Sequence, residues 1–157
     1  MLKGEEKINK ILNRYLEKFD LTATLDTDFA YYYSKNMVTY SFVVSAKYDT
    51  MFKKVCDKIA KSNMNADIFL LSLFHEIGHA ETIEDLSDEE IYSSTAVKEK
   101  VSEGTVDEKE YFYAPDEYVA TQWGIKYIQE HDKEITELWT ELQPAILQFY
   151  ADNDIER

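Results

Sequence analysis

The sequence predicts an α+β fold that is mainly helical, with a small antiparallel β-sheet or hairpin ahead of a buried central helix. Three observations lead to this prediction. The 157 residues include only 4 Gly and 2 Pro, which leaves few breaks for helices. Residues 22–47 are rich in β-branched and aromatic side chains, which favour strands. Residues 68–74 form an apolar run that suits a buried helix.

The first elements are predicted from side-chain periodicity. Apolar residues recur with a helical period over residues 5–19, which predicts a first helix. Two strand-like segments, 22–33 and 38–46, flank turn residues at 34–36 and predict a hairpin, with room for an additional strand. A second helix is expected over residues 50–62.

Capping residues predict the helices of the middle of the chain. Asn65 or Asp67 can cap the central helix, which should then run to about Thr82. The spacing of Ser87 and Glu90 is that of a capping box, which predicts another helix from this point.

Proline positions define the last part of the chain. Pro115 suits the first position of a helix that runs to about Glu130. Residues 133–150 are expected to form one helix or a pair, interrupted near Pro144. Because the chain contains no repeat, linker or low-complexity tract, we expect a single domain over residues 1–157.

Composition limits the class of protein. Cys56 is the single cysteine, so no disulfide can form within the chain, and its apolar neighbours suggest a core position. No segment has the apolar length of a membrane span or a signal peptide, so we expect a cytoplasmic protein without membrane association. The net charge of −14 argues against direct nucleic acid binding, because phosphates would repel it.

The negative charge is concentrated in residues 81–117, which hold 13 acidic and 3 basic side chains. Runs of this kind are most often solvated surfaces. The alternative interpretation is a surface that attracts a basic partner.

The most informative motif is His-Glu-Ile-Gly-His at residues 75–79. Residues four apart lie on one face of a helix, so His75 and His79 can both bind one Zn²⁺. Glu76 can then reach a metal-bound water and accept its proton. Gly78 costs about 1 kcal/mol of helix stability relative to alanine, which is tolerable if another group must approach the helix there.

A catalytic zinc ion needs a third protein ligand and an open position. The candidates are Glu117, Asp116 and His131. We favour Glu117, because Ala120 and Gly124 lie on the same helix face and allow close packing against the helix of the histidines. His131 lies near a predicted helix C-terminus, where a histidine often complements the helix dipole.

The two motifs together resemble those of the ImmA/IrrE-type metallopeptidases, which belong to the gluzincins. That family shows H-E-x-G-H followed by E-x-x-A-N-x-F-A, and this chain reads Glu-Tyr-Val-Ala-Thr-Gln-Trp-Gly at residues 117–124. The resemblance implies a zincin-like fold in which His75, His79 and Glu117 are zinc ligands. Glu76 is then the catalytic carboxylate.

The chain departs from the family pattern within the second motif. Thr121 replaces the family's asparagine and Gly124 replaces an alanine, whereas Trp123 stands where the family has an aromatic residue. A threonine hydroxyl could still accept a hydrogen bond from a metal ligand. The resemblance extends over about residues 20–130.

The resemblance implies a zinc-dependent metallopeptidase that hydrolyses a peptide bond in a protein substrate. Relatives of the ImmA type are linked to repressor cleavage, which suggests a basic DNA-binding regulator, such as that of a phage or mobile element, as the substrate. The reaction needs an oxyanion donor besides the metal, and the candidates are Tyr111, Tyr113, Tyr118 and His131.

Two other interpretations stay open. The first is an acidic, non-catalytic binding module, an inhibitor or DNA mimic, with a structural zinc site. Glu76 argues against it, because a structural site needs no carboxylate beside its first ligand. The second is a degenerate peptidase fold that serves as a scaffold.

Overall fold

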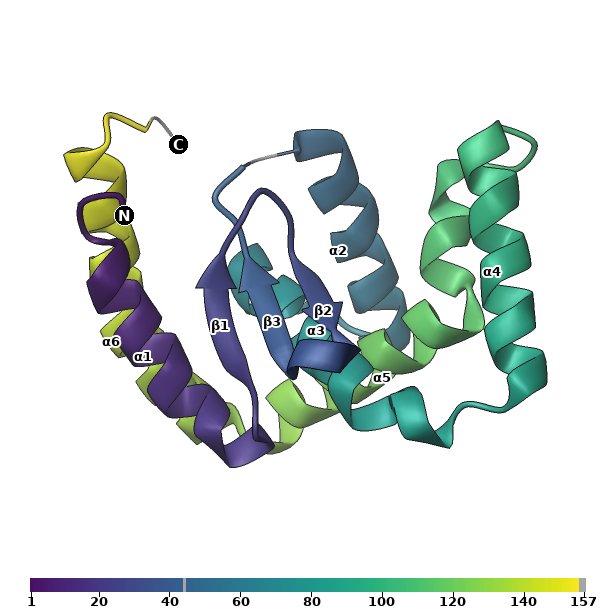
Figure 1. The fold of residues 1–157 in the computed structure, drawn as a ribbon, viewed down its shortest axis with the longest axis horizontal. Coiled ribbons are helices and arrows are strands. Elements are labelled where there is room, and N and C mark those ends of the chain that lie inside the picture. Colours follow the sequence, from purple (N-terminus) through teal and green to yellow (C-terminus); the bar gives the residue numbers. More distant parts are fainter. Residues whose placement is uncertain (44, 156–157) are drawn as a thin grey trace. The chain divides into compact units, whose positions relative to one another are not determined.

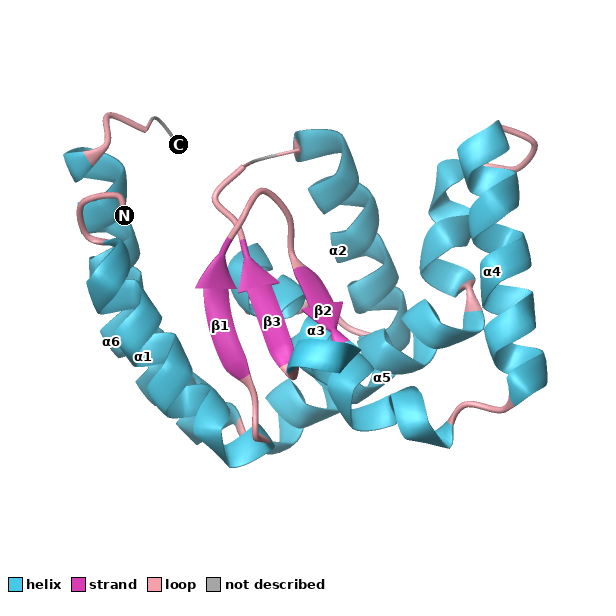
Figure 2. Ribbon diagram, viewed as in Figure 1, coloured by secondary structure: helices cyan, strands magenta, loops and turns pink. Residues whose placement is uncertain are grey.

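The computed structural model describes residues 1–43 and 45–155. Most of these residues are helical, and a small three-stranded sheet accompanies the helices, so the α+β class is confirmed (Figure 1, Figure 2). The elements are α1 (Glu5–Leu16), β1 (Thr22–Leu25), β2 (Ala30–Tyr32), β3 (Met37–Tyr40), α2 (Ala46–Ala60), α3 (Ile68–Thr82), α4 (Asp88–Glu103), a 3-10 helix (Glu108–Tyr113), α5 (Pro115–Glu130) and α6 (Asp132–Asp152).

The sheet is mixed, whereas the sequence predicted an antiparallel one. Strands β2 and β3 form the predicted antiparallel hairpin, with Tyr31 opposite Val38. Strand β1 pairs with the other edge of β3 in parallel, with Ala23 opposite Val38. Because β2 reverses the chain between them, β1 and β3 run in the same direction (Figure 2). Local side-chain patterns identify strands, but they do not specify the pairing of strands that are not adjacent in sequence.

The last helix is continuous, whereas the sequence predicted an interruption near Pro144. Helix α6 contains Pro144 in its interior. Proline removes one helical hydrogen bond, which costs stability. Leu142 and Ile146, on either side of it, are both buried. Burial of apolar surface on α6 offsets this cost, so packing rather than local propensity determines the length of the helix.

The predicted starts of three other helices are confirmed. The Asp67 carboxylate accepts a hydrogen bond from the backbone N–H of Phe69 at 2.9 Å, at the start of α3. Ser87 and Glu90 form both hydrogen bonds of the capping box that starts α4. Pro115 is the first residue of α5. Each of these signals acts within one helical turn, and this explains why the sequence alone could predict it.

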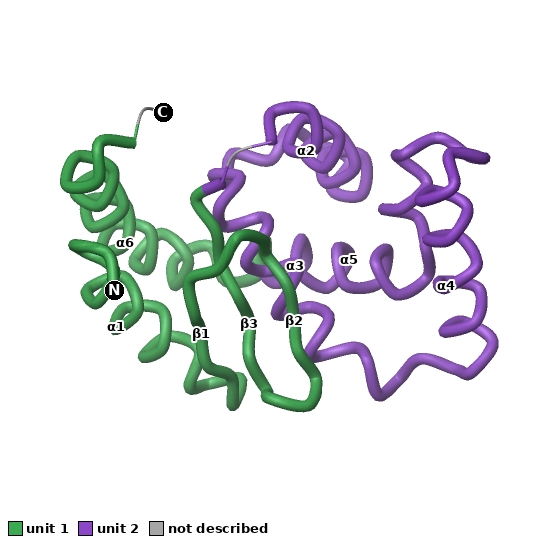
Figure 3. The backbone as a smooth tube through the Cα atoms, turned by 45° about the horizontal axis from the view of Figure 1, so that its top comes forward, with its two compact units in different colours: residues 1–42, 128–157 green, residues 43–127 purple. Residues whose placement is uncertain are grey.

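The chain comprises two compact units, which Figure 3 shows in separate colours. The first consists of residues 1–42 and 128–157, in which α1 packs against β1 and α6. The second consists of residues 43–127, in which α2 packs against α3 and the 3-10 helix. The single domain expected from the sequence stays a prediction.

Cys56 is a fully buried core residue of α2, as predicted, and burial raises the pKa of its thiol to about 12. Among the helices that the structure describes, none combines the length and apolarity needed to cross a membrane.

Candidate metal centre

Helices α3 and α5 approach each other at backbone distance because a glycine on each helix faces the other. A Cβ atom at Gly78 would lie 2.2 Å from the carbonyl oxygen of Ala120. A Cβ atom at Gly124 would lie 2.9 Å from the carbonyl oxygen of Phe74. The two contacts are one helical turn apart on each helix. The group that approaches α3 at Gly78 is therefore the backbone of α5, and the close packing predicted from Ala120 and Gly124 is present.

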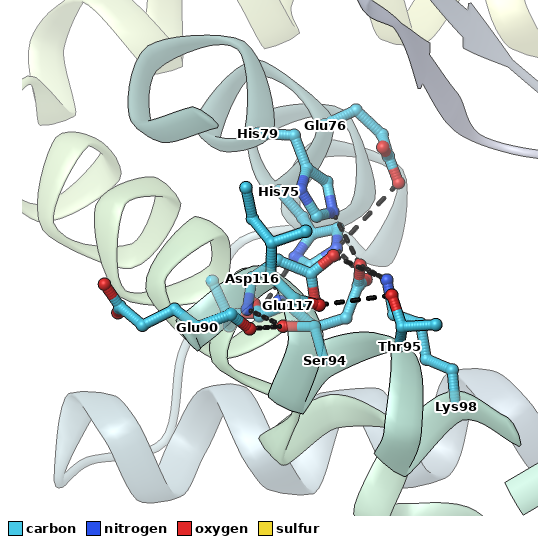
Figure 4. Close-up of polar contacts among 11 residues, drawn as sticks. His75, Glu76, His79, Glu90, Ser94, Thr95, Lys98, Asp116 and Glu117 are labelled. Atoms are coloured by element: carbon cyan, nitrogen blue, oxygen red, sulfur yellow. Dashed lines mark hydrogen bonds and ion pairs between the residues drawn. The ribbon is translucent and has the colours of Figure 1, made fainter. Parts of the chain in front are cut away.

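This contact brings Glu117, in the first turn of α5, against the two histidines of α3 (Figure 4). Nε2 of His75 lies 3.0 Å from Oε1 of Glu117, and Nε2 of His79 lies 3.0 Å from Oε2. His75 and Glu117 are buried, and His79 is partly buried. One ligand atom from each residue lies within 4.8 Å of the others. This buried group could hold a metal ion.

Thr121 and Phe52 fix the ring of His75. The Thr121 hydroxyl donates to the backbone carbonyl of Glu117 at 2.9 Å and lies 2.8 Å from Nδ1 of His75. Because a hydroxyl has only one proton to donate, it accepts the hydrogen bond from Nδ1–H. Nε2 is then the ring nitrogen directed at the group, an orientation typical of metal-binding histidines. Phe52 of α2 packs edge-on against the same ring at 5.3 Å between ring centres.

Glu76 lies beside this group of three. Its Oε1 is 3.9 Å from Nε2 of His75, and the residue is 8% exposed. Burial raises the pKa of the Glu76 carboxyl, and this effect outweighs the opposite effect of the charges on the His75 and His79 rings. A carboxyl group with a raised pKa is suited to accept a proton and return it.

The charge on Glu117 is stabilised by the histidines. Burial alone would raise the pKa of the Glu117 carboxyl, but hydrogen bonds from His75 and His79 hold it well below its usual range. Burial alone would lower the pKa of His79, but Glu117 raises it above its ordinary value. The group therefore combines an ionised carboxylate with two imidazoles, a donor set that fits a divalent metal ion.

Asp116, one of the alternative third ligands, pairs with Lys98 of α4. Nζ of Lys98 lies 2.6 Å from Oδ2 of Asp116 and 3.0 Å from Oε2 of Glu117. Burial alone would lower the pKa of Lys98, but Glu117 and Asp116 raise it. Lys98 could not be identified from the sequence, because it belongs to neither motif and only the approach of α4 to the first turn of α5 brings it to the site.

The candidate oxyanion donors have different surroundings. The ring centre of Tyr111 lies 5.4 Å from Nζ of Lys98. Burial raises the pKa of the Tyr111 hydroxyl, and the charge of Glu117 adds to this effect. Tyr113 and Tyr118 stack on each other with ring centres 5.9 Å apart. Tyr111 therefore adjoins the charged groups of the site.

His131, the other alternative third ligand, lies just before α6, in the unit formed by residues 1–42 and 128–157. The group that could hold a metal ion consists of His75, His79 and Glu117. The structure thus brings together the three residues that the sequence favoured as metal ligands.

No protein-family model, curated protein or solved structure matches this chain. The fold and the site define the class of protein only as an α+β protein with a buried His-His-Glu group. Any narrower assignment depends on the chemistry of these residues.

Proposed function

We propose that this protein is a zinc-dependent peptidase of the gluzincin type, with a zincin-like fold, that resembles the ImmA/IrrE family and hydrolyses a peptide bond in a protein substrate. The proposal depends above all on the contact of Glu117 with both histidines of the H-E-x-x-H motif. Two imidazoles and one carboxylate are a ligand set that catalytic zinc sites use. Glu76, beside the group, is the additional carboxylate that hydrolysis requires.

Zinc is the metal that this donor set fits best. His75, His79 and Glu117 would offer two nitrogen ligands and one oxygen ligand, a set that would leave a zinc ion room for a water molecule. Thr121 supports this assignment, because it holds the Nδ1 proton of His75 and directs Nε2 to the group. Bound zinc would polarise the substrate carbonyl and lower the pKa of a coordinated water to about 7.

The protein's own residues perform the proton transfers. Glu76 accepts a proton from the attacking water and then donates it to the amine that leaves. Its raised pKa brings the carboxyl closer to the neutral range in which both transfers are efficient. Tyr111 is the tyrosine best placed to donate a hydrogen bond to the developing oxyanion, because its ring lies beside Lys98, which contacts Glu117.

The test of this function is Glu76→Gln. Glutamine keeps the size of the side chain but cannot act as a general base. Zinc-loaded wild-type and variant proteins are incubated with a peptide library of broad sequence coverage, and new termini are measured by mass spectrometry. We expect the variant to bind as much zinc as the wild type and to cleave about 10²- to 10⁴-fold more slowly. Equal cleavage by both proteins, or no cleavage by the zinc-loaded wild type, would contradict the proposal.

A second candidate function is a binding module for a basic partner, such as a DNA-binding regulator. The observation that favours it is the outer surface of α4, where Ile91 is 47% exposed and Tyr92 is 79% exposed within the acidic segment 81–117. In that case the zinc site is structural, and Glu76→Gln retains full biological activity.

A further inference from the structure

Lys98 is a partly buried cation that contacts a residue of the candidate metal group. Its side chain is 31% exposed and extends from α4 to the first turn of α5 (Figure 4). There Nζ donates to Oδ2 of Asp116 at 2.6 Å and to Oε2 of Glu117 at 3.0 Å. Lys98 is thus held between two carboxylates, one of which belongs to the metal group.

The two oxygens of Glu117 have different surroundings. Oε1 lies 3.0 Å from Nε2 of His75. Oε2 lies 3.0 Å from Nζ of Lys98 and 3.0 Å from Nε2 of His79. An ammonium group on Oε2 competes with a metal ion for the lone pairs of that oxygen. A metal ion that binds Oε1 therefore competes less with the Lys98 ammonium than one that binds Oε2.

Asp116 strengthens this difference between the two oxygens. Its Oδ2 holds the ammonium of Lys98, and its Oδ1 accepts a hydrogen bond from the backbone N–H of Glu117 at 2.8 Å. Asp116 thereby fixes both the cation and the backbone from which the Glu117 side chain extends. Such partners of metal ligands orient the ligand and tune its affinity.

We propose that Lys98 is a positioning residue that engages Oε2 of Glu117, so that Glu117 binds the metal through Oε1 alone. A carboxylate that binds through one oxygen keeps a His-His-Glu site at three protein ligand atoms and leaves one tetrahedral position open. This inference rests on the proposed zinc site. It adds a residue of α4, outside both sequence motifs, to the control of that site.

The alternative is that Lys98 only anchors α4 to α5. Ser94 offers a matched control for this role, because it is the buried residue of α4 and its hydroxyl accepts a hydrogen bond from the backbone N–H of Asp116 at 3.0 Å. Ser94→Ala removes an anchor between the same two helices without changing a contact of the Glu117 carboxylate.

The experiment compares wild type, Lys98→Met, Lys98→Arg and Ser94→Ala, with Co²⁺ as the metal probe. Visible absorption of bound Co²⁺ reports coordination geometry, and four-coordinate Co²⁺ absorbs more strongly than five-coordinate Co²⁺. We expect Lys98→Met to weaken the Co²⁺ absorption, because Oε2 of Glu117 becomes free to coordinate the metal as a further ligand atom. Lys98→Arg should restore most of the absorption, because it keeps a charged donor. Ser94→Ala should lower only the melting temperature.

The outcomes separate this inference from the proposed function. If the wild type binds neither Zn²⁺ nor Co²⁺, the metal site and the inference both fail. If the wild type binds metal, and Lys98→Met binds Co²⁺ with an unchanged spectrum, only the inference is overturned.

A measurement on the wild type covers the case in which Lys98→Met does not fold. In a crystal structure of the zinc-loaded protein, we expect one Glu117 oxygen at about 2.0–2.2 Å from zinc and the other hydrogen-bonded to Lys98. Coordination through both oxygens, or a Lys98 ammonium turned away from Glu117, would overturn the inference.

Discussion

The two units of this protein bury polar side chains of different kinds. In the unit of residues 1–42 and 128–157, the buried hydroxyls of Thr39 and Ser41 donate to the backbone carbonyls of Asp28 and Thr27, at 2.7 and 2.9 Å. In the unit of residues 43–127, the ionisable side chains of His75, Glu76 and Glu117 are buried as well.

This difference separates hydroxyls that bond to the backbone from ionisable groups that need partners when they are buried. A hydroxyl that donates to a backbone carbonyl replaces its hydrogen bond to water and costs little to bury. A buried charge costs several kcal/mol unless it is paired. His75, His79 and Glu117 lie on α3 and α5 beside the close contact at Gly78, and a metal ion shared by these three residues would explain their burial.

Metal removal should affect the two units differently, and this is the largest expected effect. With free zinc at about a thousand times the Kd, binding adds about 4 kcal/mol to the free energy of unfolding, and a chelator should remove this amount. Amide hydrogen exchange should then show the greatest loss of protection in α3 and α5, which the ligands join, and a smaller loss in β1 and β3. Equal exchange with and without chelator would contradict the account.

Substitution of Gly78, at the contact between α3 and α5, should have the next largest effect on stability. Alanine normally stabilises a helix relative to glycine by about 1 kcal/mol. At Gly78 the added methyl would meet the carbonyl of Ala120 at 2.2 Å. We therefore expect Gly78→Ala to destabilise the protein by about 1–3 kcal/mol, as overpacked sites do, and to weaken metal binding by displacing Glu117.

Gly124→Ala sharpens this test, since its shortest new contact would be longer, at 2.9 Å. It should cost less stability than Gly78→Ala in urea unfolding. If Gly78→Ala stabilises the protein, α3 and α5 do not approach each other at backbone distance.

The residues that the sequence could predict are those whose signals are local. The caps at Asp67 and Ser87, and the helix start at Pro115, depend on residues within one turn. The spacing of His75 and His79 is equally local, because one turn of helix brings both side chains to one face.

Features that depend on packing between distant segments could not be predicted in the same way. The parallel pairing of β1 with β3 depends on strand order, and the continuity of α6 through Pro144 depends on burial. Glu117 was predicted because the composition of α5 indicated a close contact. Lys98 carries no such signal, since a lysine on an acidic helix has the sequence features of a solvated residue.

Removal of the hydroxyl that holds His75 should have a smaller effect. Thr121→Val keeps the shape of the side chain but leaves Nδ1 of His75 without its acceptor. We expect metal affinity, measured by competition with a chromophoric chelator, to fall about tenfold. Thr140→Val is the matched control, because the Thr140 hydroxyl makes the same type of bond to a backbone carbonyl four residues earlier, at an exposed position of α6. An equal fall in metal affinity in both variants would show that the Thr121 hydroxyl has no specific role at the metal site.

The smallest effect is expected for the buried hydroxyl of the sheet. Thr39→Val leaves the carbonyl of Asp28 without this donor and should lower the free energy of unfolding by about 1 kcal/mol. Metal affinity should stay at the wild-type value in the same titration. A loss of metal affinity in Thr39→Val would show that the contrast between the two units does not hold.

The central claim is that His75, His79 and Glu117 bind one zinc ion, and zinc content tests it most directly. Purified wild type, Glu117→Ala and His131→Ala are loaded with zinc, freed of excess metal and measured by elemental analysis. The account predicts about one zinc per chain in the wild type and in His131→Ala, and a large loss in Glu117→Ala. A wild type that takes up no zinc, or a loss in His131→Ala with retention in Glu117→Ala, would contradict it.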